Sequence, residues 1–511
     1  MNAPTVTEIS RRHNPFPRDG VVFDGNGVPR YRDLPESLPD MLKRHVDERP
    51  DSEAVVELGG ERLSYRELWN RSARVAGGLR ADGLVRGERV AIRYPAGTKW
   101  VVAFWGVIMA GGVAVAVNTR STASEARLVL DDADVRFDLN LDVPLPDGDP
   151  YVEPGLGLRD VAAMFYTSGT SGRPKGVPTT HEAFLTSAEN LIRCGGIPGD
   201  AGADLRTLIS VPLFHVTGCN SQLLVAARVG GVAIIMPVLN QAELISAIES
   251  ERITCLVTVP AVYALIARHP QFATTDVSQV RWLGYGGAPI APSLVVALQN
   301  SFPRSRVFNG YGMTETASTL TMLPHEEAAE HADSVGYAAP AVDLGIVPIG
   351  DNPAYGELVV RGAGAMTGYW RSPEATAGAF VDGWLRTGDV VRVDAAGRVH
   401  IVDRIKDIVN RGGENISSTE VEGVLVSAPD VLEAAVLAVP DDVMGEKVGA
   451  VLYSDGPIDV QRVLAHCRTQ LADFKVPQYI FVSSTPLPRN AGGKLLKAQL
   501  RGAVKWGAPL R

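Results

Sequence analysis

Apolar β-rich runs alternate with helical patterns between about residue 40 and residue 400. One representative stretch begins with the run GVAIIMP at Gly231. It continues through a helical pattern with Leu244, Ile245 and Ile248 on one face, and it returns to an apolar run at Cys255. Strand, helix and strand in this order are typical of βα units. The pattern therefore predicts an α/β fold over most of the chain.

Glycine-rich turns follow two further strand patterns. The run VRWLGYGGAP from Val280 precedes a helical pattern over Pro292 to Phe302, and VFNGYGMTE from Val307 turns sharply after a strand. Open α/β sheets bind ligands where such turns leave the carboxyl ends of strands. We therefore expect a ligand site near these glycines.

The stretch from Trp100 to Val117 has the length of a membrane span and carries no charge. Gly111 and Gly112 divide it, however, into an apolar helical part and a short valine-rich part. A parallel sheet covered on both faces produces such runs. We interpret the stretch as a buried helix end followed by a strand, and we expect no membrane span.

The last hundred or so residues have a different pattern. After Asp389, the sequence VDAAGRVHIVDRIKD predicts a hairpin with a D-A-A-G turn. A helix from Ser418, the strand AAVLAVP and a helix from Asp459 follow. The predicted fold is therefore α/β, with a large multi-lobed N-terminal domain at 1–404 and a small α+β domain at 405–511.

Charge and cysteine usage exclude several classes of protein. The 49 Lys and Arg against 58 Asp and Glu give a net charge of −9, so no global positive field attracts nucleic acid or anionic membranes. The four cysteines form no CxxC pair, which favours a reducing cytoplasm and disfavours a zinc site. The first twenty residues contain no apolar stretch of the kind found in signal peptides. We expect a cytoplasmic protein.

The segment YTSGTSGRPKG, from Tyr166 to Gly176, is the strongest chemical signal. It follows the apolar run VAAMFY and combines glycines, hydroxyls and one lysine, which suits the binding of a polyphosphate. It is not a Walker loop, because Lys175 is followed by glycine and valine. On composition alone a flexible surface loop is equally consistent.

Four more motifs follow this loop in order. They are YGMTE at Tyr311–Glu315, TGD at Thr387–Asp389, DRIKD at Asp403–Asp407 and PRNAGGK ending at Lys494. Together with the loop, they resemble the adenylate-forming superfamily, which includes acyl-CoA synthetases, luciferases and peptide-synthetase adenylation domains. The resemblance extends from SYREL at Ser64 to Lys494 and implies an AMP-forming acid–CoA ligase that uses ATP, Mg²⁺ and coenzyme A.

The resemblance implies a role for each motif. The loop would hold the β- and γ-phosphates of ATP, and Glu315, with Thr170 or Thr314, would hold Mg²⁺. Tyr311 would stack on adenine, Asn309 would bond its amino group, and Asp389 would accept the ribose hydroxyls. The full set of implied nucleotide contacts is Thr167, Ser168, Gly169, Thr170, Ser171, Gly172, Lys175, Gly286, Gly287, Ala288, Asn309, Gly310, Tyr311, Gly312, Thr314, Asp389 and Arg404.

The same resemblance implies that the C-terminal domain turns between two poses about a hinge at Lys406. In the first pose Lys494 would bridge the substrate carboxylate and the α-phosphate. In the second, Gly412 and Gly413 would line a channel for the pantetheine arm of CoA. His215 would lie where the acid pocket meets this channel. Relatives commonly have proline at the position of Ser418, and we expect serine there to loosen the start of the next helix.

Three alternatives to a CoA ligase make different predictions about the sequence. A peptide-synthetase unit would carry Asp after Phe214, where this chain has His215. An acyl-AMP ligase that delivers to a carrier protein would carry an insertion near the hinge, but only 13 residues separate Asp389 from Asp403. A catalytically silent nucleotide-binding scaffold would have lost Lys494, Glu315 or Asp389. All three are present.

The pocket candidates offer no obvious cation for a second carboxylate, which favours a monocarboxylic acid of fatty, aryl or steroid-derived type. They are His215–Gly218, Tyr285–Ala288, Gly310, Met313 and Ser318–Thr319. A homodimer is left open. The segment around Lys494 also resembles sites at which a lysine acetyltransferase modifies such ligases.

Overall fold

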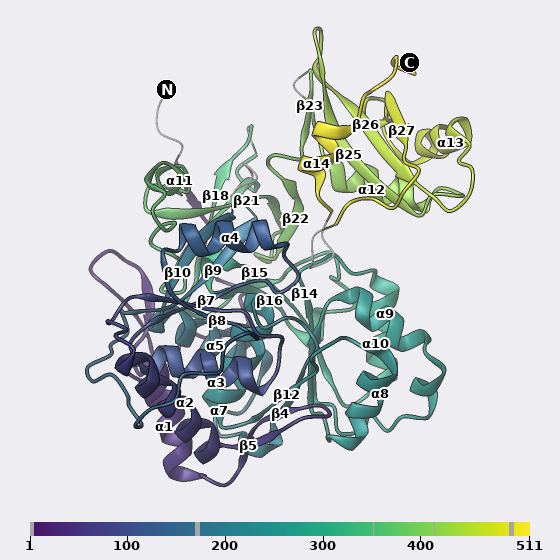
Figure 1. Cartoon of the computed structure of the whole chain (residues 1–511). Helices are drawn as coiled ribbons and strands as arrows, with labels where there is room; N and C mark the ends of the chain where they lie inside the picture. Colours follow the sequence, from purple (N-terminus) through teal and green to yellow (C-terminus); the bar gives the residue numbers. More distant parts are fainter. Residues whose placement is uncertain (1–4, 169–173, 351, 413, 490–494, 511) are drawn as a thin grey trace.

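The computed structural model describes residues 5–168, 174–350, 352–412, 414–489 and 495–510. Within these ranges the chain forms two large sheets of nine and five strands, a six-stranded sheet, a two-stranded hairpin and a C-terminal five-stranded sheet. Figure 1 shows the first four in one broad body, with the C-terminal sheet and its helices beside it, drawn in yellow-green. The predicted α/β architecture is confirmed.

The largest sheet has nine strands and carries the motifs from residue 282 to residue 323. Its central strands run parallel, and its edges pair antiparallel. In spatial order the strands are β17 (Tyr337–Ala338), β16 (Ser318–Leu323), β15 (Arg306–Met313), β14 (Trp282–Gly286), β13 (Cys255–Thr258), β11 (Arg206–Ile209), β12 (Val232–Ile235), β4 (Glu53–Glu57) and β5 (Arg62–Ser64).

The second large sheet has five strands and ends in an antiparallel hairpin, β9–β10. In spatial order its strands are β10 (Pro174–Thr180), β9 (Val161–Ser168), β7 (Val113–Ala116), β6 (Arg89–Ile92) and β8 (Val135–Leu139). The hairpin flanks the glycine-rich loop, of which residues 169–173 lie outside the described chain.

Helices shared by the two large sheets fill the main core, which takes apolar side chains from both. These helices are α1 (Leu38–Glu48), α2 (Tyr65–Ala81), α3 (Thr98–Met109), α5 (His181–Gly195) and α7 (Leu224–Val229). A second core covers the other face of the nine-stranded sheet. It is built by α8 (Gln241–Ser250), α9 (Pro260–Arg268) and α10 (Pro292–Ser301). Helix α4 (Ala123–Asp132) packs on the outer face of the five-stranded sheet.

The uncharged stretch from Trp100 to Val117 forms the end of α3 and strand β7, as the sequence predicts. Gly111 makes the turn between them with φ of 75°, a conformation that favours glycine. Trp100 is 1% exposed, and Trp105 is fully buried. Among the described residues, no helix has both the length and the apolar character needed to cross a bilayer.

The six-stranded sheet places the TGD motif. Its strands are β1 (Thr7–Glu8), β18 (Asp343–Pro348), β19 (Tyr355–Arg361), β21 (Trp384–Val393), β20 (Phe380–Val381) and β22 (Val399–Arg404). Strands β21 and β22 form the predicted hairpin, and Gly397 in its turn has φ of 88°. A separate hairpin joins β2 (Val21–Phe23) to β3 (Pro29–Tyr31), and α11 (Pro373–Gly378) precedes β20.

Beyond β22 the chain builds its own sheet and its own core. The strands are β24 (Glu414–Ile416), β23 (Val409–Arg411), β26 (Gly445–Tyr453), β25 (Glu433–Asp441) and β27 (Tyr479–Val482), and the helices are α12 (Ser418–Ser427), α13 (Val460–Gln470) and α14 (Lys497–Ala503). This matches the predicted α+β pattern, with the helix expected from Asp459 capped by that residue.

Ser418 does not loosen the start of α12. Its backbone N–H donates to the carboxylate of Asp403, and its hydroxyl accepts from Nζ of Lys497 at 2.7 Å. Ser417 caps the helix by accepting from the N–H of Glu420 at 3.2 Å. The expectation based on the missing proline was wrong because serine keeps an N–H that proline lacks.

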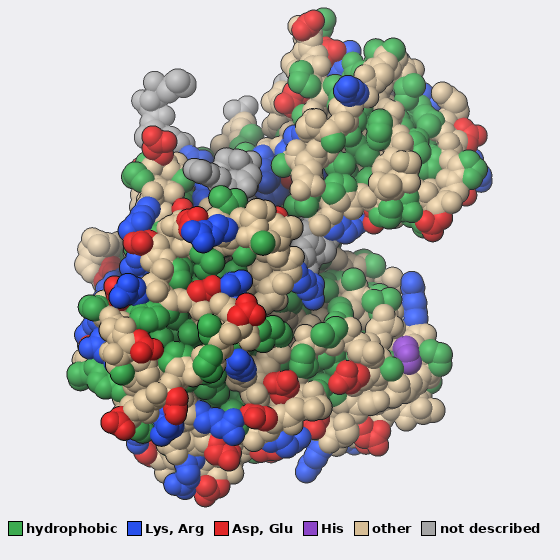
Figure 2. Space-filling model, viewed as in Figure 1, with side chains coloured by type: hydrophobic (Ala, Val, Ile, Leu, Met, Phe, Trp, Pro, Cys, Tyr) green, Lys and Arg blue, Asp and Glu red, His purple; other side chains and the backbone are tan. Residues whose placement is uncertain are grey.

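All four cysteines are buried and unpaired. Cys194, Cys219 and Cys255 lie in the main core, and Cys467 lies on α13. On the face seen in Figure 2, Lys and Arg side chains are interspersed with Asp and Glu over the N-terminal body. That distribution agrees with the modest net negative charge of the sequence.

Candidate active site

The carboxyl ends of β14 and β15 approach each other closely. Gly286 lies beside Gly310 in the parallel pairing, and Tyr285 lies beside Asn309. A Cβ atom on Gly286 would lie 2.3 Å from the carbonyl oxygen of Gly310, whereas a Cβ on Gly310 would meet no described atom within 4 Å. Gly287 then turns the chain with φ of 74°. Gly310 therefore borders open space, and Gly286 packs closely against it, at the place where the sequence predicted a ligand site.

Asp389 on β21 is the centre of a charged cluster. Its buried carboxylate accepts a hydrogen bond at Oδ2 from the hydroxyl of Tyr311, and Oδ1 pairs with Nε of Arg404 at 2.6 Å. Arg404 lies opposite Asp389 in the β21–β22 ladder. Burial, followed by the neighbouring Asp389 charge, raises the pKa of Tyr311, so its hydroxyl remains a donor. The hairpin thus joins three of the predicted site residues.

Asn309 uses one end of its side-chain amide within the protein. The residue is buried, and its Nδ2 donates to the carbonyl oxygen of Ser334 at 3.0 Å. The other polar atom of the amide, Oδ1, is an acceptor. Tyr311 and Gly312 follow on the same strand at a bulge opposite β16. Asn309 therefore combines a fixed orientation with an acceptor in the middle of β15.

Glu315 is held by a tyrosine that no sequence motif indicated. The hydroxyl of Tyr369 donates to Oε1 of Glu315 at 2.9 Å, and Nζ of Lys175 lies 4.8 Å from the centre of the Tyr369 ring. Thr314 and Glu315 form a short 3₁₀ turn after β15. Tyr369 thus connects the lysine of the glycine-rich segment with the acidic residue of the YGMTE motif.

The described ends of the glycine-rich segment form the β9–β10 hairpin. Thr167 lies opposite Lys175, and Ser168 lies opposite Pro174. A Cβ on Gly176 would lie 2.7 Å from Sδ of Met164, so a larger residue there would force the Met164 side chain to shift. The predicted contacts Gly169, Thr170, Ser171 and Gly172 lie outside the described residues.

Comparison with known proteins decides the family. The family of AMP-binding enzymes matches residues 42–143 and 139–370, and the C-terminal domain of AMP-binding enzymes matches residues 420–494. The chain belongs to the AMP-binding enzyme family. It is an AMP-forming acid–CoA ligase, an enzyme that uses ATP, Mg²⁺ and coenzyme A.

Relatives of this ligase act on different acids. A feruloyl-CoA synthase of Amycolatopsis sp. is 36% identical over 478 residues, covering 88% of this chain and 95% of the relative. A long-chain fatty acid–CoA ligase of Mycobacterium tuberculosis is 32% identical over 500 residues, covering 90% and 97%. The structure of o-succinylbenzoate CoA synthetase from Bacillus subtilis with its acyl-adenylate superposes with a TM-score of 0.81 at 28% identity, covering 91% and 99%.

A Mg²⁺ ion that binds together with ATP needs only one protein carboxylate as a ligand. Among the described residues, no group of three or more His, Cys, Asp or Glu side chains could enclose a metal ion. Mg²⁺ is usually bound through one or two carboxylates together with phosphate oxygens and water. Glu315, the acidic residue at the end of β15, therefore fits a Mg²⁺ ion that arrives with a nucleotide.

His215 lies between β11 and a π-helix at Cys219–Leu223, which follows the short helix α6 (Val216–Gly218). Its ring packs on Phe214 at 4.7 Å between centroids, and within the described chain its buried Nε2 has no hydrogen-bond partner. Burial, and secondarily Arg120, lowers the pKa of His215. The residue is therefore a neutral polar group whose Nε2 is not hydrogen-bonded within the described chain.

The predicted C-terminal residues of the ligase are only partly described. Lys406 lies in the turn after β22, where its carbonyl oxygen accepts from Nη2 of Arg501 at 2.8 Å, and burial lowers its pKa. Gly412 has φ of 61°, and its N–H donates to the carbonyl oxygen of Met444 at 2.8 Å. Gly413 and Lys494 lie outside the described residues.

Sequence reasoning missed two structural residues of the site region. Tyr369 bonds to Glu315, 54 positions away, so no local pattern could have shown the pairing. Asp403 accepts from the backbone N–H groups of Ser418 and, at 3.3 Å, of Thr419. An acidic residue near the N-terminus of a predicted helix is a general capping signal, but here the acid is 15 residues distant in sequence. Both contacts depend on tertiary structure.

Proposed function

We propose that this ligase activates a monocarboxylic, mainly apolar acid of fatty or aryl type and transfers it to CoA. In the first step a carboxylate oxygen attacks the α-phosphorus of ATP, and the bond to pyrophosphate breaks. In the second step the deprotonated thiol sulfur of CoA attacks the acyl carbon, and the bond to AMP breaks. The observation that supports a nucleotide at this place is the convergence of Tyr311, Asp389 and Arg404 beside the open edge of β14 and β15.

The contacts support specific roles for the N-terminal residues. The acceptor Oδ1 of Asn309 suits the amino group of adenine, and the ring of Tyr311, fixed by Asp389, suits stacking. Each carboxylate oxygen of Asp389 has two acceptor sites, so ribose hydroxyls can share it with Tyr311 and Arg404. We assign the backbone of Gly286, Gly287 and Ala288 to the other side of the base, and Glu315 to Mg²⁺.

We assign the phosphates of ATP to the segment from Thr167 to Lys175. Lys175 supports this assignment because its Nζ lies over Tyr369, close to the Glu315 side chain that would hold the metal. A lysine cation and a metal ion on the same phosphates would neutralise charge that develops as pyrophosphate leaves. Gly310, Gly312 and Thr314 complete the proposed nucleotide contacts.

The second half of the proposal concerns the C-terminal part. We infer a domain boundary at residues 404 and 405, a hinge at Lys406, a CoA channel beside Gly412 and Gly413, and a first-step role for Lys494. The separate sheet and core beyond β22 support a unit able to move as a body. We also infer that acetylation of Lys494 by a lysine acetyltransferase stops the first step by removing its charge.

The nature of the acid follows from the side chains near His215. The π-helix residues Cys219–Leu223 and the strand β16 carry no charged side chain, and the hydroxyls of Ser221 and Ser318 pair with each other. A second carboxylate on the substrate would find no cation on these two segments, and the charge nearest His215 is that of Arg120. Relatives named for ferulic acid and for long-chain fatty acids fit this chemistry.

One panel tests the proposed substrate class. CoA-dependent formation of AMP would be measured with fatty, aromatic and dicarboxylic acids and with amino acids, each at matched concentration. We expect turnover of monocarboxylic fatty or aromatic acids and little turnover of the others. Turnover of dicarboxylates or amino acids alone would contradict the proposal.

The role of Lys494 is tested by separating the two steps. Lys494→Ala should reduce acyl-adenylate formation by about 10²- to 10³-fold, because one positioned donor is lost, and should spare thioester formation from supplied acyl-AMP. The exposed Lys505→Ala variant is the control and should retain both steps. Equal loss of both steps in Lys494→Ala would refute a first-step role, and full activity of the protein acetylated at Lys494 would refute the acetylation switch.

A further inference from the structure

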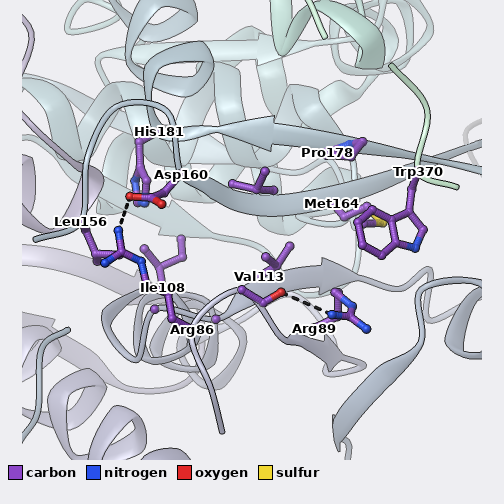
Figure 3. A pocket seen from close by; sticks show the side chains of 14 residues that line it. Arg86, Arg89, Ile108, Val113, Leu156, Asp160, Met164, Pro178, His181 and Trp370 are labelled. Carbon is purple, nitrogen blue, oxygen red and sulfur yellow. Dashed lines mark hydrogen bonds and ion pairs between the residues drawn. The ribbon is translucent and has the colours of Figure 1, made fainter. Parts of the chain in front are cut away.

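A cavity of about 180 Å³ is lined in part by β9 and β10, and none of its lining residues belongs to the proposed nucleotide site (Figure 3). Its walls are largely apolar and include Ile108 on α3, Val113 on β7, and Leu156 and Met164. An apolar protein cavity of about 150 Å³ is large enough to take a benzene ring. The volume therefore suits one small ring rather than a nucleotide or a fatty chain.

One polar group in the wall of this cavity lacks a partner. Nδ1 of His181 accepts a hydrogen bond from the backbone N–H of Leu38 at 3.1 Å, so the neutral ring carries its proton on Nε2. His181 is only 1% exposed, and no residue in the described ranges accepts a bond from that N–H. Figure 3 shows the ring at one end of the cavity beside Asp160. A ring in the cavity that carries an acceptor could therefore take a hydrogen bond from this donor.

The charged groups around the cavity are already paired. Arg86 bonds to Asp160 at 2.6 Å. Arg89 bonds to Asp134 at 2.7 Å and lies 5.2 Å from the Trp370 ring centre. Burial also lowers the pKa of His181 to about 4, which keeps its ring neutral near pH 7. A charged ligand would therefore find no free counter-charge, whereas a neutral one would lose no charge solvation.

We propose that this cavity binds a small neutral ring with one hydrogen-bond acceptor, which accepts from Nε2 of His181 and packs against the aliphatic wall and Trp370. The ligand class follows from three features together: volume, neutrality and a single directed donor. Phenol has this combination, and toluene has the same shape without the acceptor.

The cavity is connected to the proposed catalytic residues through two neighbouring residues. The indole of Trp370 lines the cavity, and its backbone N–H donates to the carbonyl oxygen of Gly176 at 2.8 Å. Tyr369, the preceding residue, contacts Lys175 and Glu315. A ring that displaces Trp370 would shift these contacts. We infer that occupancy changes the use of ATP, an effect that rests on the proposed function, whereas binding itself does not.

Binding is tested by calorimetric titration of the full chain with phenol and with toluene. The wild type should bind both, and phenol more tightly. His181→Asn keeps an acceptor for Leu38 but removes the distal donor, so it should weaken phenol about tenfold, the equivalent of one hydrogen bond, and leave toluene unchanged. Ile108→Phe should abolish both by filling the cavity. Equal affinities in all three proteins, no binding, or a crystal soaked in phenol with only water in the cavity would overturn the proposal.

Two further measurements separate the cavity from the acid site. The KM for ATP in pyrophosphate release should rise about fivefold with saturating phenol in the wild type, within the usual range of coupling between sites, and should not change in Ile108→Phe. A rise that persists in Ile108→Phe would place phenol elsewhere and refute the coupling. Val161→Leu, a milder filling of the same cavity, replaces Ile108→Phe if that variant does not fold. Binding of phenol by a protein without any ligase activity would contradict the proposed function but not the proposed ligand site in the cavity.

Discussion

At the edge of the nine-stranded sheet the buried carboxylates are held by other side chains, whereas behind the five-stranded sheet a buried imidazole N–H faces a cavity. Asp389 is held by Tyr311 and Arg404, and Glu315 is bonded to Tyr369. His181, in contrast, has only its Nδ1 engaged among the described residues. The first arrangement fixes geometry before a ligand arrives, and the second leaves a donor from which a ligand could accept a hydrogen bond.

The largest effect is expected from removing the charge of Asp389, which holds Tyr311 and Arg404. Asp389→Asn removes the charge that pairs with Arg404 and an acceptor for Tyr311, so acyl-adenylate formation should fall by about 10²- to 10³-fold. Pyrophosphate release under saturating acid measures this step.

Asp394→Asn is the matched control on the same hairpin, where Asp394 pairs with Arg398 at 2.7 Å. It should lower thermal stability while the rate of pyrophosphate release stays within about twofold, because its ion pair touches no proposed site residue. Equal loss of rate in both variants would indicate that Asp389 acts through folding alone.

The buried His181 should make the free energy of unfolding sensitive to acid. Burial lowers the pKa of His181 from 6.5 to about 4, so the unfolded chain takes up a proton below pH 6.5 that the folded chain does not. The free energy of unfolding should therefore decrease between pH 6.5 and pH 4, by on the order of 3 kcal/mol in total, and change no further from this group below pH 4. Above pH 6.5 His181 contributes no pH dependence.

Urea unfolding at several pH values measures this effect against His181→Asn, which cannot titrate in this range. The difference between wild type and variant removes the contribution of carboxylates that titrate in both proteins. A difference that stays constant from pH 7 to pH 4 would show that His181 is not protected from protonation.

A smaller effect is expected from Tyr369, which links the cavity near His181 to Glu315. Tyr369→Phe removes the hydroxyl that donates to Glu315 and keeps the ring beneath Lys175. One hydrogen bond to a charged group corresponds to about 1.5–3 kcal/mol, so the KM for Mg²⁺–ATP should rise by about tenfold or more. Tyr337→Phe, which loses a hydroxyl bonded to Glu327 instead, should leave this KM unchanged. An unchanged KM in Tyr369→Phe would show that Tyr369 does not couple the cavity to the proposed active site.

The smallest effect concerns the start of α12. Ser418→Pro loses the N–H that bonds to Asp403 but restricts the unfolded chain, and these terms, about 1.5–3 and 0.4–1 kcal/mol, oppose each other. We expect a net loss of about 1 kcal/mol in the free energy of unfolding, measured with urea. Ser418→Ala keeps the N–H and serves as the control. A gain in stability for the proline variant would show that the bond to Asp403 contributes little.

Local periodicity predicted the elements that depend on neighbouring residues. The split of Trp100–Val117 at Gly111 and Gly112, the hairpin after Asp389 and the helix beginning at Ser418 are all present. Each is determined by positions within a few residues, where apolar spacing and turn glycines act directly.

Features that depend on distant contacts were beyond sequence reasoning. The motif order indicated that Tyr311 and Asp389 serve one nucleotide, but not that their side chains bond to each other across 78 positions. Tyr369 lay in no motif, and the cavity near His181 arises from segments of α3, β7, β9 and α5 that meet only in the folded chain. The role of a side chain in such places is fixed by what packs against it.

The four buried thiols allow the opening of each part of the molecule to be measured separately. Cys194, Cys219 and Cys255 lie in the main core, and Cys467 is a buried residue of α13, so a thiol reagent reaches each of them only when its own surroundings open. Burial raises the pKa of all four, which further slows their reaction while the chain is closed. The labelling rate of Cys467 relative to the other three would report how often the C-terminal unit opens independently of the rest.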